Sequence, residues 1–299
     1  MDSAAACAGC HATEVVEWRA SQHQASFVSP DFQRSYRAEH LELCADCHAP
    51  LRTPGGARDT ASGIGCNACH VVGEGHLARG TSDRPRVTTK ACASCHDFDV
   101  PGTRVVLQST AREHAVSAFA GTSCTECHME PRAHGLRDHR FDVSRNKELL
   151  SGSIRVQSTR FSDGVVLVDV AASGVGHRFP TGDIFRRLTL TLTAITRDGG
   201  VIAGDTIHLG RDWDGHRASQ RAGATESALH DTRLTDVPRE LRLTCTVRPD
   251  RVHLTVNYER GASAEGEFFE SFGSIEIYDA DVPLEAPTAQ PASRAETSR

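Results

Sequence analysis

Residues 7–11 read CAGCH, and the same C-x-x-C-H pattern returns at residues 44–48, 66–70, 92–96 and 124–128. Two thiols followed at once by an imidazole form the attachment signal for c-type haem. The thiols form thioethers at one porphyrin edge, and the histidine becomes the proximal iron ligand. The pattern therefore predicts five covalently attached haem c groups. The predicted attachment residues are Cys7, Cys10, Cys44, Cys47, Cys66, Cys69, Cys92, Cys95, Cys124 and Cys127, and the predicted proximal ligands are His11, His48, His70, His96 and His128.

Two other uses of paired cysteines fit the sequence less well. Tetrahedral zinc sites take four ligands each, and five pairs do not divide into sites of four cysteines. Zinc also gives no reason for a histidine directly after every pair. A disulfide between cysteines two residues apart closes only a very short loop, so it constrains the unfolded chain little. Haem attachment accounts for all five histidines.

The two halves of the chain differ in composition. Residues 1–150 contain 25 Leu, Ile, Val and Phe, whereas residues 151–299 contain 36. The first half falls below the roughly 20% at which a segment can build an ordinary core. We expect porphyrin surface to supply the apolar area that this half lacks, so that it does not fold without haem.

The sixth iron ligands separate electron transfer from substrate binding, because a six-coordinate haem has no open position. Methionine cannot supply all of them, since only Met1 and Met129 are present and Met129 directly follows a proximal histidine. Histidine is the remaining choice. The chain has 16 histidines, five of them in the motifs, which leaves eleven candidates.

Several stretches resemble multihaem cytochromes related to hydroxylamine oxidoreductase and its tetrahaem electron acceptor. In the first half these are CAGCHATEVVEWRASQHQAS, LCADCHAPL, GIGCNACHVVGEGHL, CTECHME and DHRF. In the second half VGHRFPTGD, LGRDW and DTRL resemble a β-domain that is appended to the haem domain in some of these cytochromes. The resemblance covers most of residues 5–280. It implies closely packed haems, and some relatives polymerise into extracellular haem filaments.

The resemblance also implies which histidines are distal ligands. It nominates His23 in SQH, His76 in GEGH, His139 in DHRF and His177 in GHRFPTG. The fifth nominee is His114 in TAREHAVS, with His40 and His134 as substitutes. If His177 is a ligand, the β-domain is joined to the haem domain through an iron.

The predicted fold is a two-domain α+β structure. Residues 1–150 are expected to form a pentahaem domain of short helices and loops, with helices near residues 12–23 and 109–121. From residue 151 the pattern changes to the alternation typical of half-buried strands. Residues 151–282 are predicted to form an antiparallel β-sandwich of immunoglobulin type, and residues 283–299 a disordered tail. The predicted strands are 153–160, 165–170, 187–196, 241–247, 251–258 and 274–278, with Cys245 as a buried core thiol.

Charge and hydropathy restrict the partners and the compartment. The net charge is −6, which argues against a nucleic-acid partner, and no stretch is long and apolar enough to span a membrane. Attachment of haem c requires export, so we expect a periplasmic or extracellular protein. Residues 1–4 lack the features of a signal peptide, so we expect either that a leader was removed or that the start is misassigned.

Electron transfer is the predicted function. Five packed bis-histidine haems would pass single electrons between redox partner proteins, either in a carrier or in a subunit that self-associates into a haem filament. The alternative is an enzyme that reduces nitrite, hydroxylamine or a similar small oxyanion at one five-coordinate haem. Arg112 and Glu113 beside His114 would be its distal groups. No C-x-x-C-K motif is present, which favours the carrier.

Overall fold

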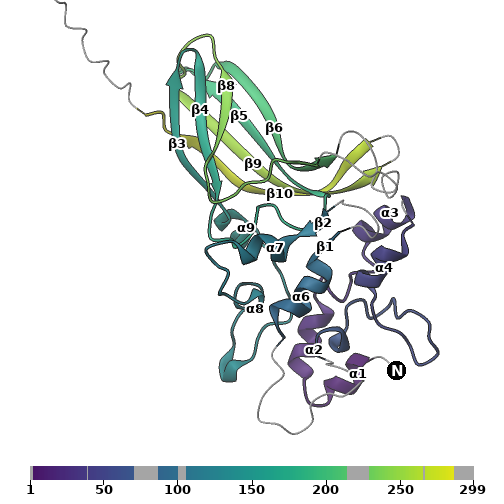
Figure 1. Cartoon of the computed structure of the whole chain (residues 1–299). Helices are drawn as coiled ribbons and strands as arrows, with labels where there is room; N and C mark the ends of the chain where they lie inside the picture. Colours follow the sequence, from purple (N-terminus) through teal and green to yellow (C-terminus); the bar gives the residue numbers. More distant parts are fainter. Residues whose placement is uncertain are drawn as a thin grey trace, which may run out of the picture.

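The structure is a computed structural model, and it describes residues 3–38, 40–70, 87–99, 106–213, 229–264 and 267–285. Short helices, loops and one two-stranded ribbon form the part before residue 153, and two larger antiparallel sheets form the part after it (Figure 1). This arrangement confirms the predicted mixture of helices with antiparallel strands. The predicted tail lies outside the described residues except for 283–285.

Four helices end at the histidine of a C-x-x-C-H motif. They are α4 (Glu42–His48), α5 (Cys66–His70), α6 (Thr89–His96) and α8 (Cys124–His128). Positions i, i+3 and i+4 of a helix share one face, so each of these helices presents two thiols and an imidazole on the same side. The first motif follows the same geometry, because the Cys7 carbonyl at the end of α1 (Ser3–Ala8) accepts a hydrogen bond from His11 N at 2.9 Å.

Further short elements connect these helices. A two-stranded ribbon follows the fourth motif directly, so its position is tied to that motif. Residues 51–63 form a loop that contains only an isolated bridge between Arg52 and Arg58. The connecting elements are α2 (Ala12–Arg19), α3 (Pro30–Ala38), β1 (Asp97–Asp99), β2 (Val106–Ser109), α7 (Thr110–Ala115), a 3-10 turn (Ala133–Gly135) and α9 (Lys147–Gly152).

Two antiparallel sheets form the second half. One has three strands in the order β3-β4-β8, and the other has five in the order β10-β9-β5-β6-β7. The strands are β3 (Ile154–Ser162), β4 (Val165–Ala172), β5 (Arg186–Ile195), β6 (Val201–Trp213), β7 (Leu229–Asp231), β8 (Arg239–Thr244), β9 (Arg251–Ala264) and β10 (Glu267–Val282). All six predicted strands are present, and β6 and β7 were not predicted.

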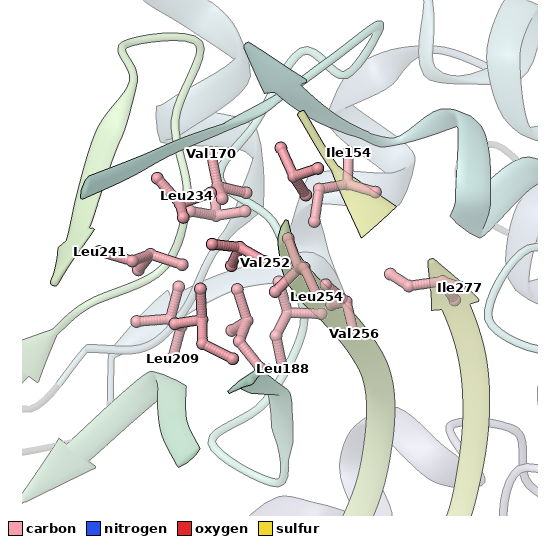
Figure 2. Packing of buried hydrophobic residues seen from close by; sticks show 14 of the residues in the cluster. Ile154, Val170, Leu188, Leu209, Leu234, Leu241, Val252, Leu254, Val256 and Ile277 are labelled. Atoms are coloured by element: carbon pink, nitrogen blue, oxygen red, sulfur yellow. The ribbon is translucent and has the colours of Figure 1, made fainter. Parts of the chain in front are cut away.

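One cluster of buried side chains joins both sheets. Val170 and Leu241 come from the three-stranded sheet, and Leu188 and Leu254 from the five-stranded sheet (Figure 2). Cys245 belongs to this cluster and is 4% exposed, as expected of a core thiol. Val247, two residues further on, is 56% exposed because β8 ends at Thr244.

The helical half has few buried apolar side chains of its own. Its described core is a small cluster of Ala4, Val15 and Trp18. A cluster of this size cannot organise more than a hundred residues, since a folded domain depends mainly on apolar burial. The low aliphatic content of the first half therefore appears in the structure as a missing protein core.

Candidate functional site: histidine pairs at the haem motifs

Three motif histidines each face a second histidine across a similar distance. The ring centres are 6.3 Å apart for His96 and His23, 6.1 Å for His70 and His139, and 6.2 Å for His128 and His177. The interplanar angles are 57°, 32° and 16° in that order. In each pair one member comes from a C-x-x-C-H motif and the other is a predicted distal ligand.

This distance fits two imidazoles bound to one iron. A first-row metal–imidazole bond is about 2 Å long, and the ring nitrogen lies about 1.1 Å from the ring centre, so two rings on opposite sides of one metal have centres about 6 Å apart. Directly stacked rings lie closer, as Phe32 and His48 do at 3.9 Å. The residues of these three pairs therefore fit bis-histidine haem iron.

Hydrogen bonds orient several of these rings. The Nδ1–H of His139 donates to the Arg137 carbonyl at 2.8 Å, and that of His177 donates to the Arg178 carbonyl at 3.1 Å. The Nδ1–H of His48 donates to the Ser26 carbonyl at 2.8 Å. A proton on Nδ1 leaves the lone pair on Nε2, which is the form that binds a metal.

The surroundings favour neutral imidazoles. Burial, reinforced by His96, lowers the pKa of His23 to about 4. Burial and then His177 lower the pKa of His128 to about 4. Because a protonated imidazole has no free lone pair, neutral rings at physiological pH are ready to bind iron.

A close backbone contact holds the segment that carries His23. Ile64 N donates to the His23 carbonyl at 2.9 Å. Gly63 has φ of +54°, and a Cβ there would lie 2.6 Å from the same carbonyl. Only glycine permits this approach without displacing the backbone. This contact fixes the loop before the third motif against the segment of His23, whose ring faces His96 of the fourth motif.

The other predicted ligands are placed differently. His11 and His48 form no such histidine pair within the described part of the chain, and His76 lies outside the described residues. His114 packs on Gly176, where an added Cβ would lie 2.8 Å from its Cδ2 atom. All five distal assignments stay predictions, and the structure places three of the nominees opposite a motif histidine. The substitute His40 contacts Tyr36 at 4.4 Å between ring centres, and the substitute His134 lies in the 3-10 turn after the fifth motif.

The motif cysteines show which motifs are neighbours. Cys47 and Cys95 lie within hydrogen-bonding reach, and this contact lowers the pKa of Cys95 to about 6 and raises that of Cys47. Burial and the nearby Cys124 raise the pKa of Cys92 to about 11. The cysteines of the fourth motif therefore lie close to those of the second, third and fifth motifs.

Three sequence motifs of the second half converge on the loop that carries His177. In DTRL, Asp231 accepts hydrogen bonds from Arg233 and forms an ion pair with Arg178 at 3.2 Å. In LGRDW, Arg211 donates to the carbonyls of Gly182 and Leu107. These contacts bring together stretches that are far apart in the sequence.

Two carboxylates contact the segments that carry His139 and His177. The sequence did not indicate Glu17, and it suggested Glu113 only as a distal group of the alternative enzyme. Glu17 of α2 accepts a hydrogen bond from His139 N at 3.0 Å, across 122 residues of sequence. Glu113 of α7 accepts one from Arg178 N at 3.0 Å. Arg112, the other group that the enzyme hypothesis invoked, is paired with Asp97 and Asp99 in β1.

Comparison with known proteins agrees with the motifs. The family model "Cytochrome c554 and c-prime" matches residues 6–71, which include the first three motifs. No curated protein sequence matches the chain. The crystal structure of a penta-heme cytochrome c552 from Thermochromatium tepidum has a TM-score of 0.66 and 22% identity, and the match covers 94% of this chain and 98% of that chain.

The fold is shared with that penta-heme cytochrome. Motifs, family model and fold together support a multihaem c-type cytochrome with covalently bound haem c. MtrC from Shewanella baltica OS185 also matches, with 14% identity over 82% of this chain and 44% of that chain, but its TM-score of 0.18 carries no argument about the fold. None of the described helices is long and apolar enough to cross a membrane.

Proposed function

We propose that this chain transfers electrons through five covalently attached haem c groups. The observation that carries the proposal is the set of three histidine pairs with ring centres 6.1–6.3 Å apart, each pair at a C-x-x-C-H motif. Two axial histidines leave no position for a substrate on an iron. When bound, the haems supply reversible one-electron chemistry between ferric and ferrous iron.

The ligand assignment follows the pairs. His96 with His23, His70 with His139, and His128 with His177 would hold the irons of the fourth, third and fifth motifs. His11 and His48 would be the proximal ligands of the first and second motifs. His76 and His114, with His40 and His134 as substitutes for His114, remain predicted distal ligands. Histidine ligation favours low reduction potentials, because methionine ligation raises them.

The fourth motif is the proposed centre of the route. Its cysteines lie next to those of the second and the fifth motif. Cys10 and His11 of the first motif and Cys127 of the fifth are exposed, which suits these two as the positions where electrons enter and leave. Redox proteins are the proposed partners, and the proposed location is periplasmic or extracellular.

The proposed organisation is a haem-binding unit of residues 1–150 and a β-sandwich unit of residues 151–282. The described contacts between them include the His128–His177 ring pair and the ion pair of Arg260 with Asp31 at 3.2 Å. Self-association into a filament stays a prediction. A single chain can serve as a carrier with the same ligands.

Reduction of nitrite or hydroxylamine at a five-coordinate haem is the second candidate. It draws support from His48, which faces no histidine among the described residues. Its predicted distal groups are engaged elsewhere, since Arg112 pairs with Asp97 and Glu113 with Arg233. The electron-transfer proposal accounts for more of the described geometry.

A redox titration of the ferric holoprotein tests the proposal. We expect reversible uptake of one electron per haem at low potential, followed by visible absorption, with no consumption of nitrite or hydroxylamine by the reduced protein. The titration is repeated with each of these compounds present, and buffer alone is the control. Rapid reoxidation by nitrite or hydroxylamine would instead establish the reductase.

A further inference from the structure

Two of the three distal histidines lie in irregular segments that are held in the same way. His139 follows the 3-10 turn at Ala133–Gly135, and His177 lies in the loop between β4 and β5. Neither backbone segment belongs to a helix or a strand ladder at that point. An axial ligand nevertheless requires a fixed position, because displacement by about 1 Å of a residue at a reacting centre is enough to impair function.

Glu113 holds the His177 segment. Its Oε2 atom accepts the backbone N–H of Arg178, the residue directly after His177, at 3.0 Å. Its Oε1 atom accepts from Arg233 Nη2 at 2.5 Å and from Ser109 Oγ at 2.6 Å. The Arg233 side chain is 3% exposed and that of Glu113 is 14% exposed. The carboxylate is therefore fixed through Oε1, and Oε2 accepts the N–H of the loop.

Glu17 repeats this arrangement at His139. Its Oε2 atom accepts the backbone N–H of His139 at 3.0 Å, and its Oε1 atom forms an ion pair with Arg132. Arg132 also donates to Asp138, the residue directly before His139, at 3.0 Å. The Glu17 side chain is 7% exposed. In both places a helix supplies the carboxylate, and an arginine orients it. The carboxylate then accepts a hydrogen bond from a backbone N–H of the distal segment.

We propose that Glu17 and Glu113 are positioning residues that keep the haems of the third and fifth motifs six-coordinate. The proposal rests on the ligand assignment under the proposed function, in which His139 and His177 bind these irons. A buried ion pair adds little net stability, because both groups lose their hydration. The main effect of each Glu–Arg pair is therefore geometric. It fixes an acceptor for the backbone N–H at or next to the distal histidine, beside the isolated bridges Pro131–Arg137 and Phe179–Leu234.

Each carboxylate should affect one haem and not the other. α2 carries Glu17 and α7 carries Glu113, and the two contact different distal segments. Loss of a carboxylate acceptor leaves its N–H unpaired and frees the segment. The distal histidine then spends part of its time away from the iron, and the haem concerned becomes partly high-spin.

The experiment compares ferric holoprotein variants by low-temperature electron paramagnetic resonance, with potentiometric titration of any high-spin signal. His139→Ala and His177→Ala each mark one haem by a full high-spin signal. Glu17→Ala and Glu113→Ala should each give a smaller signal, on the order of a tenth to a half of one haem, from an N–H left without its acceptor. Glu17→Gln and Glu113→Gln retain an acceptor oxygen and should stay close to the parent.

The signals are matched by potential. The high-spin signal of Glu113→Ala should titrate at the same potential as that of His177→Ala. The signal of Glu17→Ala should titrate at the same potential as that of His139→Ala. Added imidazole should remove all four signals. Glu130→Ala is the matched control, because Glu130 is exposed and lies two residues after His128. Where an alanine variant does not mature, Glu17→Leu or Glu113→Leu keeps the volume and removes the acceptor.

Contrary outcomes separate the two proposals. If His139→Ala and His177→Ala give high-spin haem but the alanine and leucine variants of both glutamates stay low-spin, positioning is wrong and the ligand assignment stands. If the two histidine variants themselves stay low-spin, the ligand assignment is wrong. The proposed positioning role of the two glutamates is then wrong as well. If each glutamate variant perturbs both haems equally, the effect is general destabilisation, and this too overturns the proposal.

Discussion

At the scale of single residues, the sequence predicted the residues of the repeated C-x-x-C-H motif. It did not predict contacts between residues that are far apart in the chain. C-x-x-C-H places its side chains at helical positions i, i+3 and i+4, so the cysteines and proximal histidines could be named from spacing alone. The predicted distal ligands His23, His139 and His177 came from a resemblance, because nothing local identifies them. Glu17 contacts the His139 segment from 122 residues away, and no periodicity connects two such positions.

His253 gives a pH-dependent contribution to stability. Its imidazole lies 2.9 Å from Asp281 and 2.7 Å from Asp279, which raise its pKa above the ordinary 6.5. The contribution is thus fully present below pH 6.5 and is lost as the pH rises through the higher folded pKa. We expect His253→Gln to lower the free energy of unfolding at about pH 5.5 by less than about 1 kcal/mol, since the site is partly exposed, and to have little effect at about pH 9.

Urea unfolding followed by circular dichroism at both pH values measures this difference. His208→Gln is the control on the same sheet, because partial burial lowers the pKa of His208 and its effect should have the opposite sign. An equal loss at both pH values would show that His253 acts through packing and not through its charge.

At the scale of helices and strands, alternation predicted the strands with clear period two. β5 alternates buried leucines with threonines, and Leu188, Leu190 and Leu192 are fully buried. β6 escaped prediction because Gly204 and Asp205 interrupt its apolar residues, although pairing with β5 satisfies its backbone. β8 ends earlier than its pattern indicated, so Val247 faces solvent.

The buried face of these strands predicts a matched pair of substitutions. Val168 of β4 is fully buried, whereas Val201 of β6 is 69% exposed. Val168→Ala removes the same carbons as Val201→Ala but leaves a cavity, so it should lower the free energy of unfolding by about 2 kcal/mol. The exposed change should cost less than about 0.5 kcal/mol.

Denaturant unfolding of both holoproteins measures the pair. Equal effects of the two substitutions would mean that the two sheets do not share a tightly packed interior at Val168. The haem spectrum should be the same in both variants, because Val168 packs in the core cluster of the two sheets and Val201 is exposed on β6.

At the scale of the whole molecule, the two halves obtain their stability from different sources. The second half has a protein core drawn from both of its sheets. The first half has its cysteines and histidines on short helices and almost no buried apolar cluster. Composition predicted this contrast, and it could not predict that VGHRFPTGD, LGRDW and DTRL meet at one loop. His177 of the second half faces His128 of the fifth motif, so this ring pair is one of the contacts between the halves.

Electron paramagnetic resonance of the unmodified ferric holoprotein tests the central claim most directly. The account predicts low-spin haems, with rhombic signals from the pairs whose imidazole planes lie 16° and 32° apart and a more anisotropic signal from the pair at 57°. Cyanide and nitrite should leave these three signals unchanged, because both axial positions are occupied by histidine. High-spin signals from three or more haems would contradict the account. So would the loss of any of the three low-spin signals when cyanide is added.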